Sequence, residues 1–413
     1  MLYRPIRKAE IPIVAEIQSR AFRRDAARYL EAYEGPWRFS WRDLRVLEDE
    51  QGTPVAAVTL FHRAVSLNGS EMTAGLVGGV AVPPEQRRRG YASAMMGGLL
   101  EELSRHKTPL SLLFPFSSAW YQRLGYGLAN LTWHLTIPPR LLVDHVERRN
   151  VRRCESDDEA GMRACYERAR LDPRNNGWLA RSDWEWTHRV WKLEHESAVY
   201  ETDGRVEGYL VYTLAWGGEG APVEVIEWVW TSEAAWRGLA GFLAALGDQA
   251  TAIVHSAPQG DPLLLSLPEP YDRMGRAVEF VFYPTAQLIS GFMLRVVHLP
   301  EALRQRRYPS DLRATLLLQV DDPQLPANSQ PWQVEFAGGA ATVRPAVQRL
   351  AAAQHARLAV HTDIATFGQL FAGLLSAEQA RLTGRLQADD TTCALLSVAF
   401  AAAPWHMWEA DWF

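Results

Sequence analysis

The chain has few of the residues that build metal centres or disulfide frameworks. Its three cysteines, Cys154, Cys165 and Cys393, are scattered, odd in number and never spaced as C-x-x-C. Its eleven histidines form neither an H-E-x-x-H motif nor another paired metal-ligand spacing. These absences argue against a disulfide scaffold, and they predict a protein of a reducing compartment that has no dedicated metal site.

Long hydrophobic runs and strong positive charge are also missing. No run of 18 apolar residues occurs, and the first residues, MLYRPIRKAEIP, lack the apolar core of a signal peptide. We therefore expect no membrane span and a cytoplasmic location. The formal net charge is −5, and the basic run Arg87–Arg89 is short and local, so nucleic acid is not the expected partner.

The composition that remains is that of a soluble globular protein. The chain has 413 residues, of which 47% are hydrophobic and 22% are charged. A chain of this length is too long for one ordinary hydrophobic core, so we expect two or three domains.

The stretch from Gly78 to Leu103 carries the strongest local signal. It predicts a strand at Gly79–Val82, a turn at Pro83–Arg89, and a helix that opens near Gly90 with apolar residues at helical spacing. A helix N-terminus offers unpaired backbone N–H groups and a positive dipole end, and the preceding arginines add charge, so the stretch predicts an anion site. An ordinary strand–turn–helix with a solvated arginine run would show the same pattern. Neither a GxxxxGK[ST] loop nor a GxGxxG turn follows the strand, which argues against both kinds of nucleotide-binding fold.

The spacing V-x-V-x-P followed by R-x-x-G-x-A resembles the acetyl-coenzyme A signature of the GNAT N-acetyltransferase superfamily. The resemblance implies acetyl-coenzyme A as cosubstrate and no metal. It implies that the loop amides hold the pyrophosphate, and that the strand amides hold the pantetheine arm where the strand splays from its neighbour. The coenzyme-binding residues that it implies are Val80, Ala81, Val82, Arg87, Arg88, Arg89, Gly90, Tyr91 and Ala92.

A second motif, SSAWYQRLGYG, follows the next expected strand. Tyr121, Arg123, Gly125 and Tyr126 match the Y-x-[KR]-x-G-[FY] segment of the same superfamily. The resemblance implies that Tyr121 protonates the leaving thiolate, a role for which a phenol hydroxyl is suited. The alternative is that Tyr121 only packs. We expect Tyr126 to fill the aromatic core position of the motif.

Residues 23–42 break the helical period and mix aromatic with acidic side chains, among them Asp25 and Trp37. Such a mixture could wall a pocket for a cationic acceptor through charge pairing and cation–π contact. A surface helix and loop whose aromatic side chains lie along the surface would give the same composition.

Beyond Pro138-Pro139 the order of expected strands and helices imitates the first part of the chain. The corresponding turn, WTSEAAWRGL, lacks the coenzyme spacing, so we expect a second GNAT-like domain that has lost coenzyme binding. From about Ser290, the run GFMLRVVHLPEAL resembles the sterol-carrier-like C-terminal domain of the Eis-type (enhanced intracellular survival) acetyltransferases. The predicted fold is mixed α+β. Its domains are a catalytic GNAT domain at 1–139, a degenerate GNAT-like domain at 140–287 and a sterol-carrier-like domain at 288–413.

The last ten residues, PWHMWEADWF, are aromatic and acidic and contain no lysine or arginine. Trp405, Trp408, Trp412 and Phe413 are costly to expose to water, so we expect this end to be buried. The Eis-type resemblance implies that the α-carboxylate of Phe413 enters the active site and takes the proton of the acceptor amine. Glu409 and Asp411 could add negative potential for a cationic acceptor. The alternative is that the segment is only a packing plug.

Together these features predict an acetyl-coenzyme A-dependent N-acetyltransferase that transfers the acetyl group directly, without a covalent enzyme intermediate. The resemblance implies aminoglycoside-, polyamine- or lysine-like acceptors and a homo-oligomer, often a hexamer. Two alternatives stay open. The chain could be a binding module for coenzyme A and an apolar ligand with little turnover, or it could transfer a longer acyl group.

Overall fold

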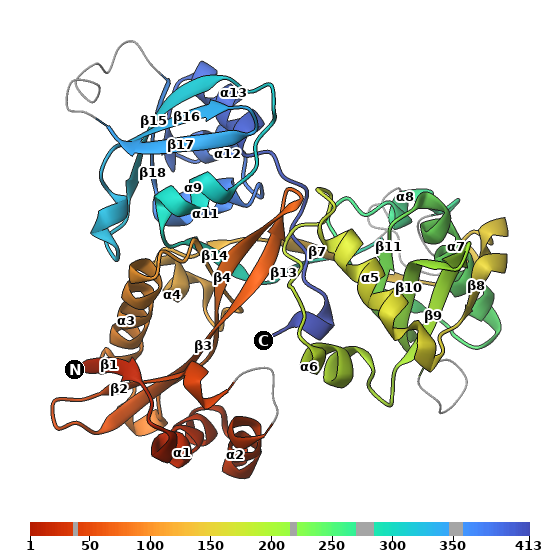
Figure 1. Cartoon of the computed structure of the whole chain (residues 1–413), viewed down its shortest axis with the longest axis horizontal. Helices are drawn as coiled ribbons and strands as arrows, with labels where there is room; N and C mark the ends of the chain where they lie inside the picture. The colour runs from red at the N-terminus through yellow and green to blue at the C-terminus, as the bar shows by residue number, and fades with distance from the viewer. Residues whose placement is uncertain (36–39, 215–220, 270–284, 347–357) are drawn as a thin grey trace, which may run out of the picture. The chain divides into compact units, whose positions relative to one another are not determined.

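The fold is described from a computed structural model of the chain, drawn in Figure 1. The chain divides into two compact units. The first unit contains Met1–Ala129, Gly291–Ala403 and Phe413, and the second contains Asn130–Ser290 and Pro404–Trp412. The residues that the structure describes are 1–35, 40–214, 221–269, 285–346 and 358–413.

A mixed sheet of seven described strands, in the order β1-β2-β3-β4-β5-β14-β6, forms one part of the first unit. Its neighbours are antiparallel except for β4 and β5, which run parallel. Its strands are β1 (Leu2–Pro5), β2 (Leu44–Glu48), β3 (Pro54–Leu67), β4 (Ser70–Ala81), β5 (Leu110–Leu113), β6 (Gly127–Leu128) and β14 (Met293–Val296), and its helices are α1 (Ile11–Phe22), α2 (Ala26–Glu34), α3 (Tyr91–Arg105) and α4 (Ser118–Gln122).

Local sequence accounts for two features of this sheet. β3 and β4 form a hairpin that turns at Asn68 and Gly69, and both residues adopt positive φ angles, of 50° and 72°. This is the backbone conformation that a tight two-residue turn requires. The helix expected near Gly90 begins at Tyr91.

Two strands belong to other sheets than the predicted domain boundaries imply. β14 was expected to open the third domain, but it lies between β5 and β6 in the first sheet. β7 (Leu131–Ile137) falls within the predicted domain 1–139, but it pairs with strands of the second unit. Apolar runs and alternation predict how far a strand is buried, and they do not indicate which sheet it joins.

The second unit is built on a sheet in the order β13-β7-β12-β11-β10-β9-β8. A hairpin that turns at Asp203-Gly204 joins β9 to β10. The elements other than β7 are β8 (Val151–Arg153), β9 (Glu196–Thr202), β10 (Arg205–Leu214), β11 (Val223–Trp230), β12 (Ile253–Pro258), β13 (Gln287–Ser290), α5 (Glu159–Arg170), α6 (Asp183–Glu185), a π-helix (Trp186–Val190), α7 (Glu233–Ala245), α8 (Leu263–Ser266) and short 3-10 helices that include Pro139–Leu141 and Val146–Asn150.

The segment Pro404–Trp412, which we call the tail, packs into the second unit. Trp405 and Trp408 are buried, with exposed fractions of 1% and 3%, and Trp408 belongs to the core that Trp178 and Trp228 also join. The prediction of burial is therefore confirmed for these two tryptophans. It is wrong for Trp412, whose side chain is 46% exposed and whose indole nitrogen donates to the Met407 carbonyl.

Two buried histidines make this core sensitive to acid. Burial lowers the pKa of His255 to about 4 and that of His406 to about 3, each helped by the charge of a neighbouring histidine. Unfolded histidine titrates near 6.5, so the stabilisation of the neutral rings is complete above that pH and is lost as the pH falls toward the folded values. At pH 5 we expect the free energy of unfolding to be lower by about 2 kcal/mol per ring than at pH 7.

Urea unfolding followed by tryptophan fluorescence checks this prediction, because Trp408 contacts both rings. Other groups also titrate between pH 5 and 7, so the informative quantity is the difference between variants. His406→Leu should reduce the loss of stability from pH 7 to pH 5, whereas His106→Gln, at an exposed position, should leave that loss unchanged. An unaltered loss in His406→Leu would contradict the prediction.

The remaining part of the first unit is a five-stranded sheet in the order β17-β16-β15-β18-β19, covered by helices. A hairpin that turns at Gly338-Gly339 joins β16 to β17, and β15 runs parallel to β18. The elements are α9 (Leu299–Gln305), β15 (Ala314–Asp321), β16 (Trp332–Ala337), β17 (Ala340–Pro345), β18 (Leu358–Asp363), α11 (Ile364–Phe371), α12 (Ala377–Leu382), β19 (Leu386–Gln387) and α13 (Asp390–Ala399).

Candidate active site

A bulge interrupts β4 where the sequence predicts pantetheine binding. Ala57 of β3 lies opposite Ala81, but Thr59 lies opposite Gly78, so β4 carries one extra residue in between. Gly79 has a φ of +60° there, in the left-handed region that glycine tolerates best. A bulge of this kind kinks the strand and removes one residue from the ladder.

The same part of β4 also separates from β5. Their parallel pairing ends at Val77 and Leu113, whereas β4 continues to Ala81. β5 therefore provides no pairing partner for the backbone of Gly78–Ala81, which includes the predicted residues Val80 and Ala81. Val82 follows directly after the strand and is half-buried. Backbone groups without a ladder partner can bind the amides of a ligand.

Gln18, which the sequence analysis missed, and Tyr33 brace the bulge. The Gln18 side-chain amide of α1 donates to the Gly79 carbonyl over 3.2 Å, and its own carbonyl accepts from the Tyr33 hydroxyl of α2. Gln18 is only 1% exposed. A signal was present, because Gln18 follows Ile11 by seven residues and Val14 by four, so it is a polar residue on the apolar face of its helix.

The N-terminus of α3 lies at the end of the turn that follows β4. Gly90 is its N-cap residue, with a φ of +82°, and no side chain caps the helix. A Cβ atom on Gly90 would have no atom within 4 Å, so open space adjoins the first amides of the helix. Such a terminus favours an anionic group. The predicted residues Tyr91 and Ala92 form its first turn and are half-buried.

The three arginines of the turn are exposed, and one of them, Arg87, also hydrogen-bonds to backbone carbonyls of the same unit. Arg87 donates to the Val82 carbonyl over 3.3 Å and to the Ala21 carbonyl of α1 over 3.2 Å. Arg88 adopts a φ of 63°, and Arg89 precedes Gly90 directly. Arg87, Arg88 and Arg89 therefore lie directly before the helix N-terminus, and their part in coenzyme binding stays a prediction.

A buried ion pair holds α3 in place. Glu102 of α3 accepts hydrogen bonds from the Arg45 guanidinium of β2, at 2.7–3.2 Å, and from the Tyr3 hydroxyl of β1, at 2.6 Å. Burial alone would raise the pKa of Glu102, but these hydrogen bonds and the charge of Arg45 hold it below its usual range. The helix is thereby fixed to two strands of the sheet.

Tyr121 lies on the short helix α4 and is 2% exposed. Its ring contacts those of Phe116, Trp120 and Tyr126, with centroid distances of 5.3, 4.7 and 5.9 Å. Burial raises the pKa of the Tyr121 phenol, helped by Tyr126, so the hydroxyl stays protonated at neutral pH. Within the described ranges no group hydrogen-bonds to this hydroxyl, whereas the Tyr126 hydroxyl is bonded to Ser111 Oγ at 2.7 Å. Tyr126 is completely buried, as expected of a core residue.

Phe413 belongs to the first unit. Its ring lies 5.8 Å from that of Phe61 on β3 and 5.3 Å from that of Phe114, which follows β5. Its carboxyl carbon lies 3.9 Å from the position that a Cβ atom on Gly78 would occupy. The C-terminal carboxylate is therefore placed against β4, directly before the bulge.

The residues expected to bind the acceptor do not form a group within one unit. Asp25 is exposed and acts as the N-cap of α2, where its Oδ1 accepts from the Ala27 backbone amide at 2.9 Å. Trp37 lies outside the described residues. Glu409 belongs to the second unit, where it begins a short 3-10 helix, Glu409–Asp411.

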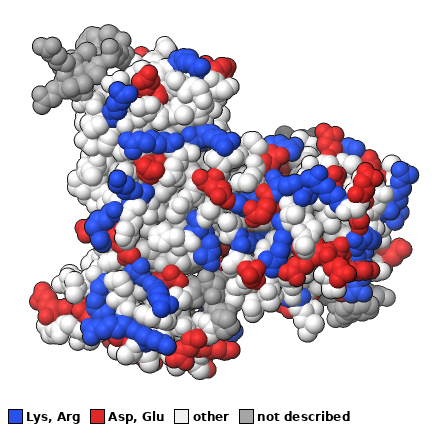
Figure 2. Space-filling view, viewed as in Figure 1, with Lys and Arg blue, Asp and Glu red and all other residues white. Residues whose placement is uncertain are grey.

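Within the described ranges, no three His, Cys, Asp or Glu side chains gather where they could hold a metal ion. The same ranges contain no helix that is both long and apolar enough to cross a membrane. Figure 2 shows positive and negative side chains interspersed over the face that it displays.

Three family models match the chain in succession. Residues 2–129 match an acetyltransferase (GNAT) domain, residues 177–296 match a second acetyltransferase (GNAT) domain, and residues 299–408 match a sterol carrier protein domain. The predicted series of tandem GNAT domains followed by a sterol-carrier-like domain is confirmed.

Curated relatives are N-acetyltransferases. The chain is 28% identical over 313 residues to an uncharacterized N-acetyltransferase of Streptomyces griseus, an alignment that covers 69% of this chain and 71% of the relative. It is 32% identical over 178 residues to another uncharacterized N-acetyltransferase, of Streptomyces coelicolor, covering 38% and 41% of the two chains.

Solved structures with the same fold cover the whole chain. A GCN5-related N-acetyltransferase of Anabaena variabilis superposes with a TM-score of 0.83 at 22% identity, over 100% of both chains. Eis1 of Mycobacterium abscessus superposes with a TM-score of 0.79 at 19% identity, again over 100% of both. The matched domains and the fold define an acetyltransferase. Two stretches of the chain match GNAT acetyltransferase domains, and the whole chain shares the fold of Eis1.

Proposed function

We propose that the chain is an acetyl-coenzyme A-dependent N-acetyltransferase that transfers the acetyl group directly to an amine. The observation that carries the proposal is the C-terminal carboxyl group of Phe413, which lies against Gly78 directly before the bulge of β4. An amine with a pKa near 10 is mostly charged at pH 7 and cannot attack a thioester until it loses a proton. A carboxylate beside the thioester site both attracts the ammonium group and accepts that proton.

The coenzyme would bind along β4 and α3. The open N-terminus of α3 and the exposed Arg87–Arg89 supply partners for the pyrophosphate, and the backbone of Val80 and Ala81 supplies partners for the pantetheine arm. The Val80 amide lies in the bulge and would polarise the thioester carbonyl, because a fixed N–H stabilises the oxyanion that develops there.

In the transfer step the amine nitrogen forms a bond to the acetyl carbon, and the bond from that carbon to sulfur breaks. The ammonium group first gives one proton to the Phe413 carboxylate. The leaving thiolate then receives the proton of the Tyr121 hydroxyl, and the second proton, which the nitrogen loses as the amide forms, restores that hydroxyl. The raised pKa of Tyr121 supports this second role, because the phenol still carries its proton at neutral pH. The acceptors that we propose are cationic amines of aminoglycoside, polyamine or lysine type.

A thiol-release assay tests the proposal. Acetyl-coenzyme A is offered with a panel of aminoglycosides, polyamines and lysine peptides, and acetyl-, propionyl- and longer thioesters are compared on the best acceptor. Release that depends on an amine would support the proposal, and preference for a longer thioester would correct the acyl group. Tight coenzyme binding without release on any acceptor would favour a binding module.

The open space at Gly90 gives a separate prediction for coenzyme binding. Gly90→Ala should weaken coenzyme A binding about tenfold, because a methyl group would enter the space beside the first amides of α3. Gly52→Ala is a matched control, since Gly52 also has a positive φ, of +78°, and open space around it, but lies in the β2–β3 turn. Both changes should cost about 1 kcal/mol of stability. Titration calorimetry and thermal unfolding measure the two effects, and equal binding by the two variants would contradict the prediction.

A further inference from the structure

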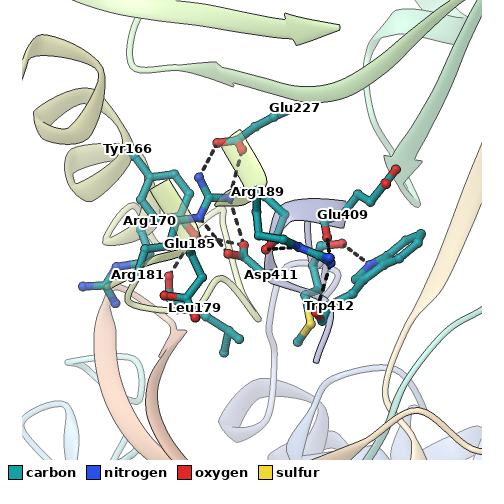
Figure 3. Close-up of polar contacts among 12 residues, drawn as sticks. Tyr166, Arg170, Leu179, Arg181, Glu185, Arg189, Glu227, Glu409, Asp411 and Trp412 are labelled. Carbon is teal, nitrogen blue, oxygen red and sulfur yellow. Dashed lines mark hydrogen bonds and ion pairs between the residues drawn. The ribbon is translucent and has the colours of Figure 1, made fainter. Parts of the chain in front are cut away.

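A buried ionic cluster in the second unit holds the tail, as Figure 3 shows. The Arg181 guanidinium lies between two carboxylates, with its nitrogens 2.7 and 3.1 Å from the Asp411 oxygens and 2.9 and 3.0 Å from the Glu227 oxygens. All three side chains are completely buried. Tyr166 donates a hydrogen bond to Asp411, and Tyr209 donates one to Glu227.

A second arginine holds the backbone of the same segment. Arg189 donates to the carbonyl oxygens of Glu409, Ala410 and Trp412, over 3.1, 3.4 and 3.2 Å. The Trp412 carbonyl is the last one before Phe413, because the next bond of the chain is the peptide bond to that residue. Arg189 therefore hydrogen-bonds to the peptide group that joins Trp412 to Phe413.

Packing alone would not require this cluster. Trp405 and Trp408 are already buried without it, and Trp408 belongs to the apolar core described above. Removing three charged groups from water is costly, and a well-packed apolar substitute is often as stable. Burial raises the pKa of Glu227 even though Arg181 opposes the shift, which reflects that cost. Ionic hydrogen bonds, unlike apolar contacts, fix the direction of the groups that they join.

We propose that Arg181 and Arg189 are positioning residues, which hold the tail so that the Phe413 carboxylate stays where it can accept the proton of the amine. This inference rests on the proposed function of that carboxylate. It gives the second GNAT domain a task that needs no coenzyme site, namely to bind the end of its own chain.

The test uses Arg189, because its loss leaves no buried carboxylate unpaired. The variants are Arg189→Met, which keeps an apolar side chain without donors, and Arg189→Lys, which keeps a charge and donors. Arg174→Met is the matched control, since Arg174 is an exposed arginine of the same unit whose side chain bonds Asp172. Asp411→Asn provides a second variant that perturbs the cluster through the tail itself.

Turnover is measured for each variant in the full-length chain and in a chain that ends at Trp412. Arg189→Met should lower kcat roughly 10- to 100-fold in the full-length chain, because a small displacement of a reacting group has effects of that size, and should leave KM for acetyl-coenzyme A unchanged. In the shortened chain the same substitution should have no further effect. Arg189→Lys should recover part of the activity, and Arg174→Met should behave as the unsubstituted chain.

Carboxypeptidase A provides a readout that does not depend on turnover, because it releases a C-terminal phenylalanine only from an accessible chain end. Arg189→Met and Asp411→Asn should each release Phe413 at least about tenfold faster at an unchanged melting temperature. Equal losses of kcat in both chain lengths, or unchanged release, would overturn the positioning role alone. Full activity of the chain that ends at Trp412 would instead overturn the proposed base.

Discussion

Removal of Phe413 should lower kcat for amine acetylation by roughly 10²- to 10⁴-fold, the usual contribution of a positioned general base. KM for acetyl-coenzyme A should change little, because the β4 backbone and the N-terminus of α3 remain. The loss should shrink as the pH rises toward the pKa of the amine, since a neutral amine needs no base. Thiol release followed from pH 7 to pH 10 measures all three effects.

The matched control keeps the aromatic ring and moves only the carboxylate. A chain extended by one glycine retains the contacts of Phe413 with Phe61 and Phe114 but carries its carboxylate one residue further along. It should lose nearly as much activity as the shortened chain. If the extended chain is fully active and the shortened one is not, the ring rather than the carboxylate matters, and the segment is a packing plug.

Tyr121→Phe should lower kcat by about 100-fold or more at pH 7, because the leaving thiolate would then take its proton from water. The ring remains, so the contacts with Phe116 and Trp120 should persist and the melting temperature should change little. Single-turnover thiol release separates this effect from product dissociation.

Tyr126→Phe is the control for the loss of a buried phenol hydroxyl. Its hydroxyl is bonded to Ser111, so its removal should cost about 1 kcal/mol of stability, the net value of one hydrogen bond, and reduce turnover less than tenfold. A similar reduction of kcat in both variants would show that general damage to the aromatic cluster, and not loss of an acid, explains the effect of Tyr121→Phe.

The strand, turn and helix of the proposed coenzyme site could be predicted because the information that specifies them is local. A strand, a turn and a helix follow one another within 26 residues, and the position of Gly90 at the N-terminus of α3 follows from helical spacing and from glycine's tolerance of positive φ. The tryptophans of the tail were expected to be buried for an equally local reason, namely the cost of exposing them.

The rest could not be predicted because it joins residues that are far apart in the chain. Arg181, Glu227 and Asp411 belong to three separate segments, and nothing in the neighbourhood of any one of them specifies the other two. Trp412 shows a related limit. Composition predicts that its side chain is buried, but the side chain is exposed, and the backbone carbonyl of the residue accepts a hydrogen bond from Arg189. Asp25 caps a helix, which is a local role. The aromatic and acidic composition of residues 23–42 fits that role as well as it fits an acceptor pocket, so composition alone could not distinguish the two.

The place of β14 has a consequence for how the chain is made. The first sheet stays incomplete until residues 293–296 have left the ribosome, by which time the whole span from Asn130 to Ser290 has been synthesised. Until then β5 lacks one neighbour, and an unpaired strand edge invites wrong pairing and aggregation. A fragment that ends at residue 129 or 139 would keep every coenzyme motif but lack a central strand. The first sheet is therefore discontinuous in sequence, and the shortest chain that can complete it ends at Val296.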